Sequence, residues 1–323
     1  MQTTILGRTT LHVSRIAYGT WQLGGDWGSF DEDGATSAIR HALDLGINFF
    51  DTAQGYGFGA SERLLGKALR KEITHDRDSV VIATKGGILP NGGGRDASAD
   101  YLRRGVEESL RALGVDTIDL YQVHWPDKKV PAEETAGALQ ELVEAGKIRY
   151  VGVSNYDVRQ MEEFSEVRPV DTLQPPYHLF RRGIEADILP YTRKHNIGVL
   201  TYSPLGSGLL TGRFDESTTF EDDDWRSKAT AFTGEAFKRN LAVVRRLEEF
   251  AAERGISVSQ LAIGWVLAQP GVDVAIVGAR SSANIEASAA AADVKLSEND
   301  LSRIDEIIAD GVPVEGATPE GVL

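Results

Sequence analysis

Four residues with complementary acid–base chemistry lie in the first half of the sequence. Asp51 ends the apolar run at 47–50, where a carboxylate is costly to bury unless a cation pairs with it. Tyr56 follows within a glycine-rich turn, Lys85 follows a second apolar run, and His124 follows a third. A carboxylate, a phenol, an ammonium and an imidazole are groups that hold or transfer a proton in catalysis.

Together these groups suit the protonation of an oxygen that is gaining negative charge. A free phenol has a pKa of about 10, which makes it a weak acid near neutrality. An ammonium beside Tyr56 would stabilise the phenolate, and a pKa lower by about two to three would make the phenol an effective general acid. Asp51 would hold Lys85 charged and in place, and a neutral His124 could donate a hydrogen bond to the substrate oxygen. The combination indicates carbonyl reduction.

The elements that must position these residues alternate between short strands and amphipathic helices. In the helical stretches apolar residues recur every three or four positions, which is typical of one buried face. Strand-like runs lie at 16–19, 47–50, 80–84, 119–123, 148–153, 172–174, 199–202 and 274–277, and helical patterns lie at 35–45, 99–113, 135–145, 185–195, 241–254 and 284–292. Eight strand–helix units predict an α/β fold, the (β/α)8 TIM barrel.

No linker or break in composition divides the chain, so we expect one domain over residues 1–323. Its predicted parts are a hairpin plug at 3–13, a barrel at about 16–292, additional helices at 257–269 and 301–309, and a C-terminal helix and tail over 297–323 that is loosely ordered from 311. The polar segment 215–234 contains three consecutive Asp. It is either a mobile lid or a surface excursion.

Barrel enzymes carry their active sites at the carboxyl ends of the strands. We expect Asp51, Lys85 and His124 at such ends. The later strands end in further polar or aromatic residues, which are Ser154, Asn155, Gln174 and Tyr202. A single polar residue at the end of a strand is more often an ordinary surface residue. Several polar residues at the same end of the barrel predict an active site. We expect Asp51 and Lys85 to pair across this mouth, within reach of Tyr56.

Composition excludes several classes of function. The net charge of −14 and the pI of about 4.9 argue against nucleic acid as a partner, because phosphate binding needs a basic surface. No apolar run approaches the roughly 18 residues of a membrane helix, and no secretory signal is visible. Cys is absent, which fits a cytoplasmic protein. The His residues lack metal-ligand spacing and no G-x-S-x-G motif occurs, so neither a metal nor serine hydrolysis is expected.

Several segments together resemble the aldo-keto reductase family over nearly the whole chain. They are DTAQGYGFGASERLLGKAL, ATKGG, LYQVHWPD, GKIRYVGVSNY, QPPYHLF and YSPLGSGLLTG. The resemblance includes the branch related to potassium-channel beta subunits. It implies a barrel that binds NADPH without a Rossmann domain and reduces aldehydes and ketones. By motif match, Asp51, Tyr56, Lys85 and His124 take the catalytic positions, with Tyr56 as the acid.

The resemblance also assigns cofactor contacts. Tyr202 would stack on the nicotinamide ring, while Ser154, Asn155 and Gln174 would hydrogen-bond its carboxamide. The other implied contacts are Gly19, Thr20, Trp21, Asp51, Ser203, Pro204, Leu205, Gly206, Ser207, Gly208, Gly278 and Ala279, with the run 203–208 around the pyrophosphate. The glycine-rich stretch 206–212 lacks G-x-G-x-x-G spacing, which argues against a Rossmann loop.

At the adenosine end, Arg280 and Arg213 could bind a 2′-phosphate, since a guanidinium suits that group; each is also compatible with a solvated surface position. Asn284 stands where family members often have Arg or Gln. Ala287 and Ser288 replace a Glu-Asn pair that commonly contacts adenine, and Val277 replaces a common Pro. We expect NADP(H) in preference to NADH.

The substrate is expected to be a small carbonyl compound that contacts Tyr56 and His124. Trp21, Trp125, Trp27, Phe58 and Tyr177 are candidate aromatic walls, or packing residues of their loops; of these, Trp21 and Trp125 are predicted to bind substrate.

Two other functions stay open. Lys85 could form a Schiff base in a barrel lyase or aldolase, although pairing with Asp51 would keep it protonated. The chain could also be a non-catalytic, cofactor-binding regulatory subunit. A monomer is the default oligomeric state.

Overall fold

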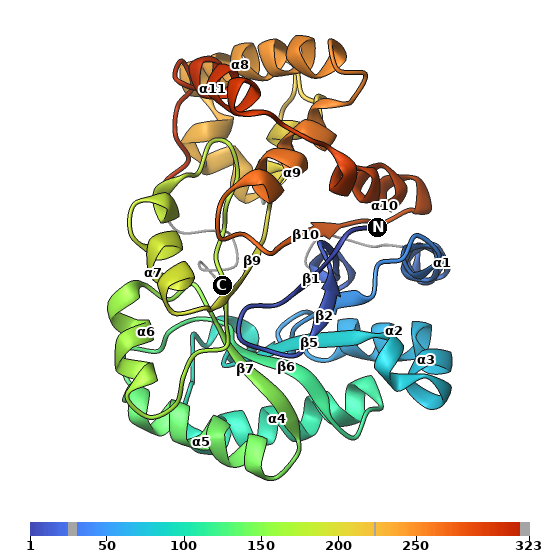
Figure 1. The fold of residues 1–323 in the computed structure, drawn as a ribbon, viewed down its shortest axis with the longest axis vertical. Helices are drawn as coiled ribbons and strands as arrows, with labels where there is room; N and C mark the ends of the chain where they lie inside the picture. Colours follow the sequence, from blue (N-terminus) through green and yellow to red (C-terminus); the bar gives the residue numbers. More distant parts are fainter. Residues whose placement is uncertain (25–30, 223, 317–323) are drawn as a thin grey trace.

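The computed structural model describes residues 1–24, 31–222 and 224–316. At its centre eight parallel strands close into a barrel in the order β10, β3, β4, β5, β6, β7, β8, β9 (Figure 1). The strands are β3 (Ile16–Gly19), β4 (Phe49–Asp51), β5 (Val81–Gly86), β6 (Ile118–Val123), β7 (Ile148–Ser154), β8 (Thr172–Gln174), β9 (Gly198–Thr201) and β10 (Val274–Gly278). The predicted barrel is confirmed.

Alternate residues of each strand face opposite sides, as the two-residue period of a strand requires. Ala17 and Leu120 belong to a buried cluster inside the barrel. Their neighbours Tyr18 and Tyr121 belong to the larger core between the strands and the helices. A polar side chain at an inward-facing strand position therefore lies inside the barrel.

An antiparallel hairpin of β1 (Thr3–Ile5) and β2 (His12–Ser14) closes the barrel floor and lies in front of the strands in Figure 1. Leu6, Leu11 and Val13 are buried in the same cluster as the inward-facing strand residues. The predicted plug is confirmed. It extends one residue beyond the expected 3–13, because Ser14 pairs with Thr3.

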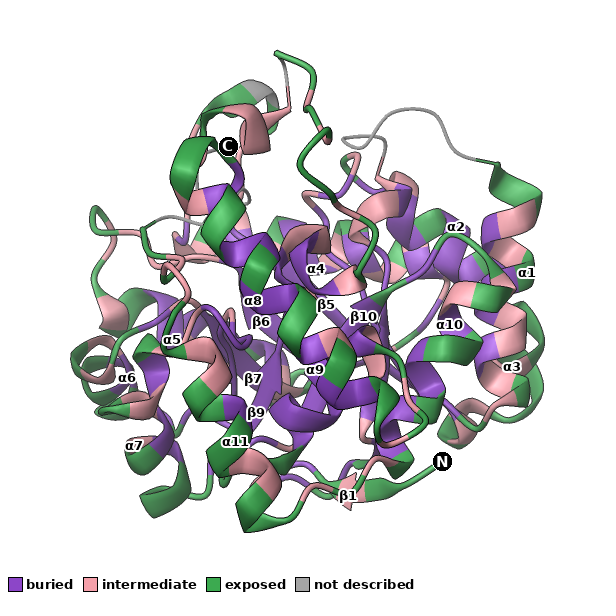
Figure 2. Cartoon of the chain, turned by 90° about the horizontal axis from the view of Figure 1, so that it is seen from above, coloured by how far each residue is buried: buried purple, intermediate pink, exposed green. Residues whose placement is uncertain are grey.

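Helices surround the barrel, with buried faces toward the strands and exposed faces outward (Figure 2). They are α1 (Glu32–Asp44), α2 (Ala60–Ala68), α3 (Arg70–His75), α4 (Ala99–Leu113), α5 (Ala132–Glu144), α6 (Val158–Ser165), α7 (Ile188–Lys194), α8 (Gly234–Ala252), α9 (Val258–Ala268), α10 (Ser282–Ala289) and α11 (Glu298–Ile308). Among the described helices, none combines the length and apolar character needed to cross a bilayer.

The structure corrects several predicted bounds. Helices α2, α3 and α6 were not expected from the sequence. The pattern at 185–195 forms a 3-10 turn (Gly183–Glu185) followed by the shorter α7. Asp51 and Lys85 lie within β4 and β5 rather than after them. These two strands pair with each other, so both side chains start from rigid, neighbouring backbone.

The segment 215–234 contains two 3-10 turns, Trp225–Lys228 and Thr230–Phe232. Its described residues are held by edge-to-face aromatic contacts: Phe232 lies 5.7 Å from Phe220 and 5.5 Å from Trp225, centroid to centroid. Phe220 also packs against Phe237 of α8. The described part of the segment is therefore packed against α8.

The beginning of the C-terminal tail is also attached, which corrects the expectation of loose order from 311. The amide of Val312 donates to Asn240 Oδ1 at 2.7 Å, and the amide of Val314 donates to the carbonyl oxygen of Phe180 at 2.7 Å. Residues 317–323 and Trp27 lie outside the described residues, so the predictions for them are not addressed.

Candidate active site

Asp51, Lys85 and Tyr56 lie in direct contact inside the barrel mouth. The Lys85 ammonium lies 2.6 Å from Asp51 Oδ2 and donates to the carbonyl oxygen of Thr52 at 2.9 Å. It also lies 3.3 Å from the Tyr56 hydroxyl oxygen. Lys85 is fully buried, with an exposed fraction of 0%. The ammonium is therefore fixed between a carboxylate and a phenol, as the sequence led us to expect.

His124 completes the cluster from the end of β6. Its imidazole packs edge-on against the Tyr56 ring, with centroids 5.6 Å apart and planes at 79°. Trp21, in the 3-10 turn after β3, lies on another side of Tyr56 at 6.5 Å between centroids. His124 and Tyr56 are both buried. The phenol is thus held between an imidazole, an indole and an ammonium.

The turn that carries Tyr56 depends on its glycines. Gly57 has φ +62°, and a Cβ there would lie 2.3 Å from the carbonyl oxygen of Gly24. Phe58 also adopts a left-handed conformation, with φ 45°, which is costly for a residue with a side chain. Gly59 then begins α2. The turn therefore brings Tyr56 back over the mouth before the chain leaves along α2.

Asp51 has further polar partners beyond Lys85. Gln174, at the end of β8, donates from Nε2 to Asp51 Oδ1 at 2.9 Å. Gln122 of β6 donates to the same oxygen at 3.3 Å. The sequence prediction did not include Gln122, although it lies two residues before His124 and so on the same face of the strand. That spacing was the signal that could have identified it.

Ser154, Asn155 and Tyr202 lie together at the rim. Ser154 Oγ donates to the carbonyl oxygen of Gln174 at 2.8 Å. Asn155 donates from Nδ2 to the carbonyl oxygen of His124 at 3.1 Å, and its Oδ1 accepts from the Tyr202 hydroxyl at 2.9 Å. Asn155 has φ +63°, a conformation that Asn tolerates better than most residues. One flat aromatic ring and several amide or hydroxyl groups therefore line this part of the mouth.

The loop after Tyr202 is built from left-handed residues. Ser203, Gly206, Ser207 and Gly208 have φ values of 55°, 54°, 54° and 100°, and Pro204 and Leu205 complete the run. Within the loop the amides of Gly206 and Gly208 donate to the carbonyl oxygens of Ser203 and Leu205, at 2.9 and 3.2 Å. Arg226 donates to the carbonyl oxygen of Ser207 at 3.2 Å. The segment 215–234 is thereby connected to this loop.

Two of the residues expected around adenosine lie close together. Arg213 Nη2 lies 3.5 Å from Asn284 Oδ1, so these two meet. Arg280 is exposed before α10. The carbonyl oxygen of Ala279 accepts from Tyr18 at 2.6 Å, which anchors the end of β10 next to Gly278.

At the facing strand ends, Gly19 pairs in register with both Asp51 and Gly278. Thr20 Oγ1 lies 3.2 Å from the carbonyl oxygen of Asp51. The small residues after β3 therefore border the ion pair.

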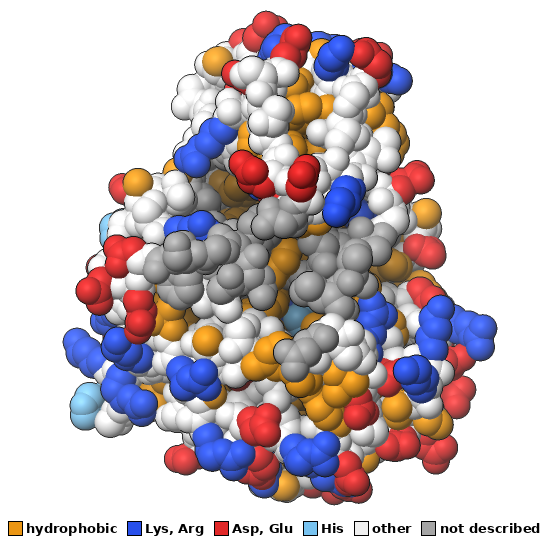
Figure 3. Space-filling view, turned by 180° about the vertical axis from the view of Figure 1, so that it is seen from behind, with side chains coloured by type: hydrophobic (Ala, Val, Ile, Leu, Met, Phe, Trp, Pro, Cys, Tyr) orange, Lys and Arg blue, Asp and Glu red, His pale blue; other side chains and the backbone are white. Residues whose placement is uncertain are grey.

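The candidate aromatic walls differ in position. Trp125 stacks under the Arg95 guanidinium, which lies 4.5 Å from its ring centroid. Tyr177 is fully buried and donates to Glu185 at 2.6 Å; it is a core residue and does not form a wall. Phe58 is 44% exposed. Figure 3 shows the face opposite the hairpin, hollowed at its centre, with hydrophobic side chains inside the hollow.

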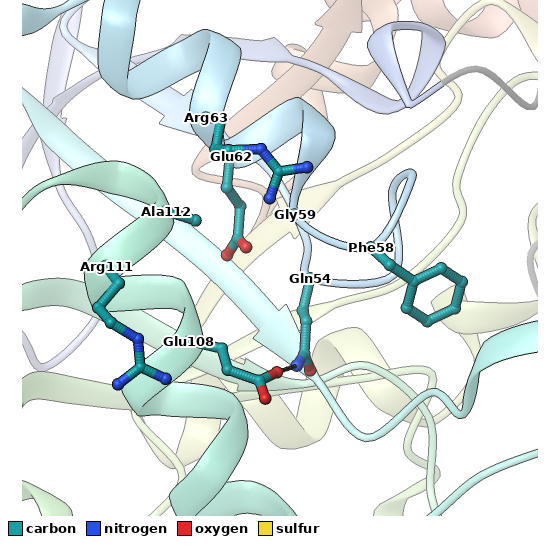
Figure 4. A pocket seen from close by; sticks show the side chains of 8 residues that line it. All are labelled: Gln54, Phe58, Gly59, Glu62, Arg63, Glu108, Arg111 and Ala112. Carbon is teal, nitrogen blue, oxygen red and sulfur yellow. Dashed lines mark hydrogen bonds between the residues drawn. The ribbon is translucent and has the colours of Figure 1, made fainter.

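A second polar layer lies behind the strands, between α2 and α4 (Figure 4). Thr84, which precedes Lys85 and faces outward, donates to Glu62 Oε1 at 2.6 Å. Gln54 donates to Glu108 Oε2 at 2.7 Å, and burial raises the pKa of Glu62. Gln54, Glu62 and Glu108 border an outer pocket of about 370 Å3. Gln54 and Glu62 tie the turn that carries Tyr56 to α4 and β5.

No group of three or more His, Asp or Glu that could hold a metal ion occurs within the part of the chain that the structure describes.

Comparisons with known proteins identify the family of this chain. The family model described as the Aldo/keto reductase family matches residues 15–309. The chain is 44% identical over 312 residues to "Aldo-keto reductase YhdN" of Bacillus subtilis, covering 95% of this chain and 94% of that protein. It is 35% identical over 312 residues to "Aldo-keto reductase yakc [NADP(+)]" of Schizosaccharomyces pombe, covering 94% and 91%.

A solved structure is similar over almost its full length. The glycerol dehydrogenase AKR11B4 from Gluconobacter oxydans superimposes with a TM-score of 0.89 at 42% identity, covering 98% of each chain. Together with the match over residues 15–309, this similarity places the chain among oxidoreductases. The chain belongs to the aldo/keto reductase family.

Proposed function

We propose that this protein reduces aldehydes or ketones to alcohols with NADPH, using Tyr56 as the proton donor. The observation that carries the proposal is the contact of the buried Lys85 ammonium with both Asp51 and the Tyr56 hydroxyl, at 2.6 and 3.3 Å. An ammonium at that distance favours the phenolate over the neutral phenol. Lys85 would therefore stabilise the phenolate that forms when Tyr56 gives up its proton.

The residues at the mouth fit a nicotinamide dinucleotide. Tyr202 offers a flat ring, and Ser154, Asn155 and Gln174 offer hydroxyl and amide groups for a carboxamide. The loop 203–208, with four residues at positive φ, would bind the pyrophosphate, and Arg213, which lies 3.5 Å from Asn284, would bind a 2′-phosphate. The S. pombe relative is named for NADP(+), which supports NADP(H) in preference to NADH.

In the proposed reaction, the bound nicotinamide supplies hydride to the carbonyl carbon. His124 donates a hydrogen bond to the carbonyl oxygen and orients it toward Tyr56. The Tyr56 hydroxyl then gives its proton to that oxygen, and the resulting phenolate is stabilised by Lys85. Asp51, at 2.6 Å from the Lys85 ammonium, holds Lys85 in place. In the reverse direction, alcohol oxidation, the Tyr56 phenolate accepts the alcohol proton.

The same contacts weigh against a Schiff-base mechanism. Lys85 Nζ contacts three oxygens within 3.3 Å and its side chain is fully buried, which leaves a substrate carbonyl carbon little access to it. A cofactor-binding regulatory subunit, as in the potassium-channel branch, would not need the buried contact between Lys85 and Tyr56. A monomeric, cytoplasmic protein that acts on small carbonyl compounds remains our prediction.

An NADPH-consumption screen over aldehydes, ketones and sugars, repeated with NADH, tests the proposal. We expect turnover with a subset of carbonyl compounds and a higher kcat/KM with NADPH. Borohydride treatment in the presence of substrate should leave Lys85 unmodified. Covalent trapping on Lys85 would support the lyase instead, and cofactor binding without any turnover would support a regulatory subunit.

A further inference from the structure

The interior of the barrel contains a buried amide that neither the motifs nor the proposed chemistry assigns. Gln122 of β6 is fully buried. Its Nε2 donates to Asp51 Oδ1 at 3.3 Å, and its Oε1 accepts from Gln174 Nε2 at 3.2 Å. It therefore contacts two residues that the proposed function needs: one that holds Lys85 and one that faces the nicotinamide.

The barrel provides space for this side chain. Gly152 of β7 pairs with Gln122 across the strands. A Cβ at Gly152 would lie 2.9 Å from Gln122 Cγ and 2.3 Å from Thr172 Oγ1. No side chain larger than hydrogen fits there while Gln122 keeps its position. The glycine and the glutamine thus form a matched pair on neighbouring strands.

An amide is chemically suited to this position. Asp51 Oδ2 is occupied by Lys85, and Oδ1 accepts from both Gln122 and Gln174. An amide can donate to a carboxylate and accept from a second amide at the same time. Apolar residues can do neither, and a carboxylate at this position would face Asp51 with a like charge.

We infer that Gln122 is a positioning residue that aligns Asp51 with Lys85 and holds Gln174 in its orientation toward the nicotinamide. Through Asp51 it acts on the ammonium beside Tyr56, and through Gln174 it acts on cofactor binding. This inference rests on the proposed function. It predicts that one buried amide affects both the acidity of Tyr56 and the affinity for NADPH.

Gln122→Met tests the inference because it keeps the approximate volume and removes both hydrogen bonds. We expect kcat to fall by about 10- to 100-fold, the range seen when reacting groups are misplaced by small distances. We also expect KM for NADPH to rise and the kinetic pKa of the acid to move upward, since Lys85 is held less well. Gln140→Met, on the outer helix α5, is the control and should match the wild type.

Gln122→Glu gives a second readout that does not depend on lost packing. At low pH the introduced carboxyl is protonated, can donate to Asp51, and should preserve turnover. As pH rises it becomes charged next to Asp51, so kcat should fall along a new limb that the wild type lacks.

The outcomes separate this inference from the proposed function. If the wild type is active and the kinetics of Gln122→Met lie within about twofold of it, Gln122 only fills the barrel. The same conclusion follows if Gln122→Met lowers stability but leaves the pH profile of kcat unchanged. An inactive wild type in the carbonyl screen would reject the proposed function itself. A Gln122→Glu profile parallel to that of the wild type would also overturn the positioning role.

Discussion

The Lys85 ammonium and the Tyr56 hydroxyl oxygen lie 3.3 Å apart, and Lys85 reaches Asp51 at 2.6 Å on its other side. These contacts bring a strand-end lysine and a loop tyrosine to one point, although 29 positions separate them in the chain. Mutations of Lys85 and Asp51 can therefore separate the contribution of this ion pair to stability from its contribution to catalysis.

Lys85→Met should lower kcat for carbonyl reduction by about 100-fold or more, because Tyr56 loses the charge that stabilises its phenolate. It should also lower the free energy of unfolding by about 3 to 5 kcal/mol, since Asp51 is left buried without its cation. Steady-state kinetics and urea denaturation measure the two effects. The double variant Asp51→Asn/Lys85→Met should regain most of the stability but none of the turnover; recovery of both would contradict the role of Lys85.

The ring of Tyr202 is predicted to stack on the nicotinamide. The hydroxyl of Tyr202 donates a hydrogen bond to Asn155. Tyr202→Ala should raise the Kd for NADPH by about 10-fold or more, from the loss of a stacked ring. Tyr202→Phe keeps the ring and loses only the 2.9 Å hydrogen bond to Asn155, so its effect should be smaller. Fluorescence titration measures both values, and equal effects of the two variants would argue against stacking.

Arg226 connects the packed segment 215–234 to the loop 203–208. It pairs with Asp224 at 2.6 Å, stacks on Phe220 and donates to the carbonyl oxygen of Ser207. Arg226→Ala should loosen that loop and weaken NADPH binding by about 10-fold, corresponding to about 1.4 kcal/mol. Arg245→Ala, which removes an exposed pair with Glu216, is the matched control and should bind NADPH normally. Similar losses in both variants would indicate a general effect of charge.

His178 predicts a specific pH dependence of stability. Burial lowers the pKa of His178 from 6.5 to about 3, so the folded protein keeps the imidazole neutral while the unfolded chain binds a proton below 6.5. The stability contributed by the neutral imidazole is therefore lost as pH falls from 6.5 toward 3, at about 1.4 kcal/mol per pH unit. Urea denaturation of wild type and His178→Gln should show a shallower pH dependence in the variant. Parallel curves would contradict the assignment.

Much of the architecture could be predicted from residue patterns. Buried strands such as 172–174 are bounded by polar ends, and helices such as α4 carry a strong apolar face. Helix α2 was missed because its buried face includes Ser61, Glu62 and Gly66, which break the apolar period. Helix α6 was missed because only Met161 and Phe164 are buried within it.

The candidate site was predicted where the residues carry charge or a distinctive ring. Asp51, Lys85 and His124 stand out at the ends of apolar runs, and the structure brings them together with Tyr56. Gln122 was missed because a neutral amide carries no charge to mark it, although its two-residue spacing from His124 places it on the same face of the strand. Tyr177 was predicted as a possible wall of the substrate pocket. The sequence could not show that it is buried, because it packs against Trp265, which is distant in the sequence but lies 5.2 Å away between ring centroids.

The most direct measurement is the turnover of Tyr56→Phe with a carbonyl substrate that the wild type reduces. This variant keeps the ring between His124 and Trp21 and removes only the hydroxyl next to Lys85. We predict that kcat falls by about 100- to 10,000-fold, while NADPH binding stays within about twofold of the wild type. Near-normal reduction by Tyr56→Phe, with NADPH bound as in the wild type, would contradict the assignment of Tyr56 as the proton donor.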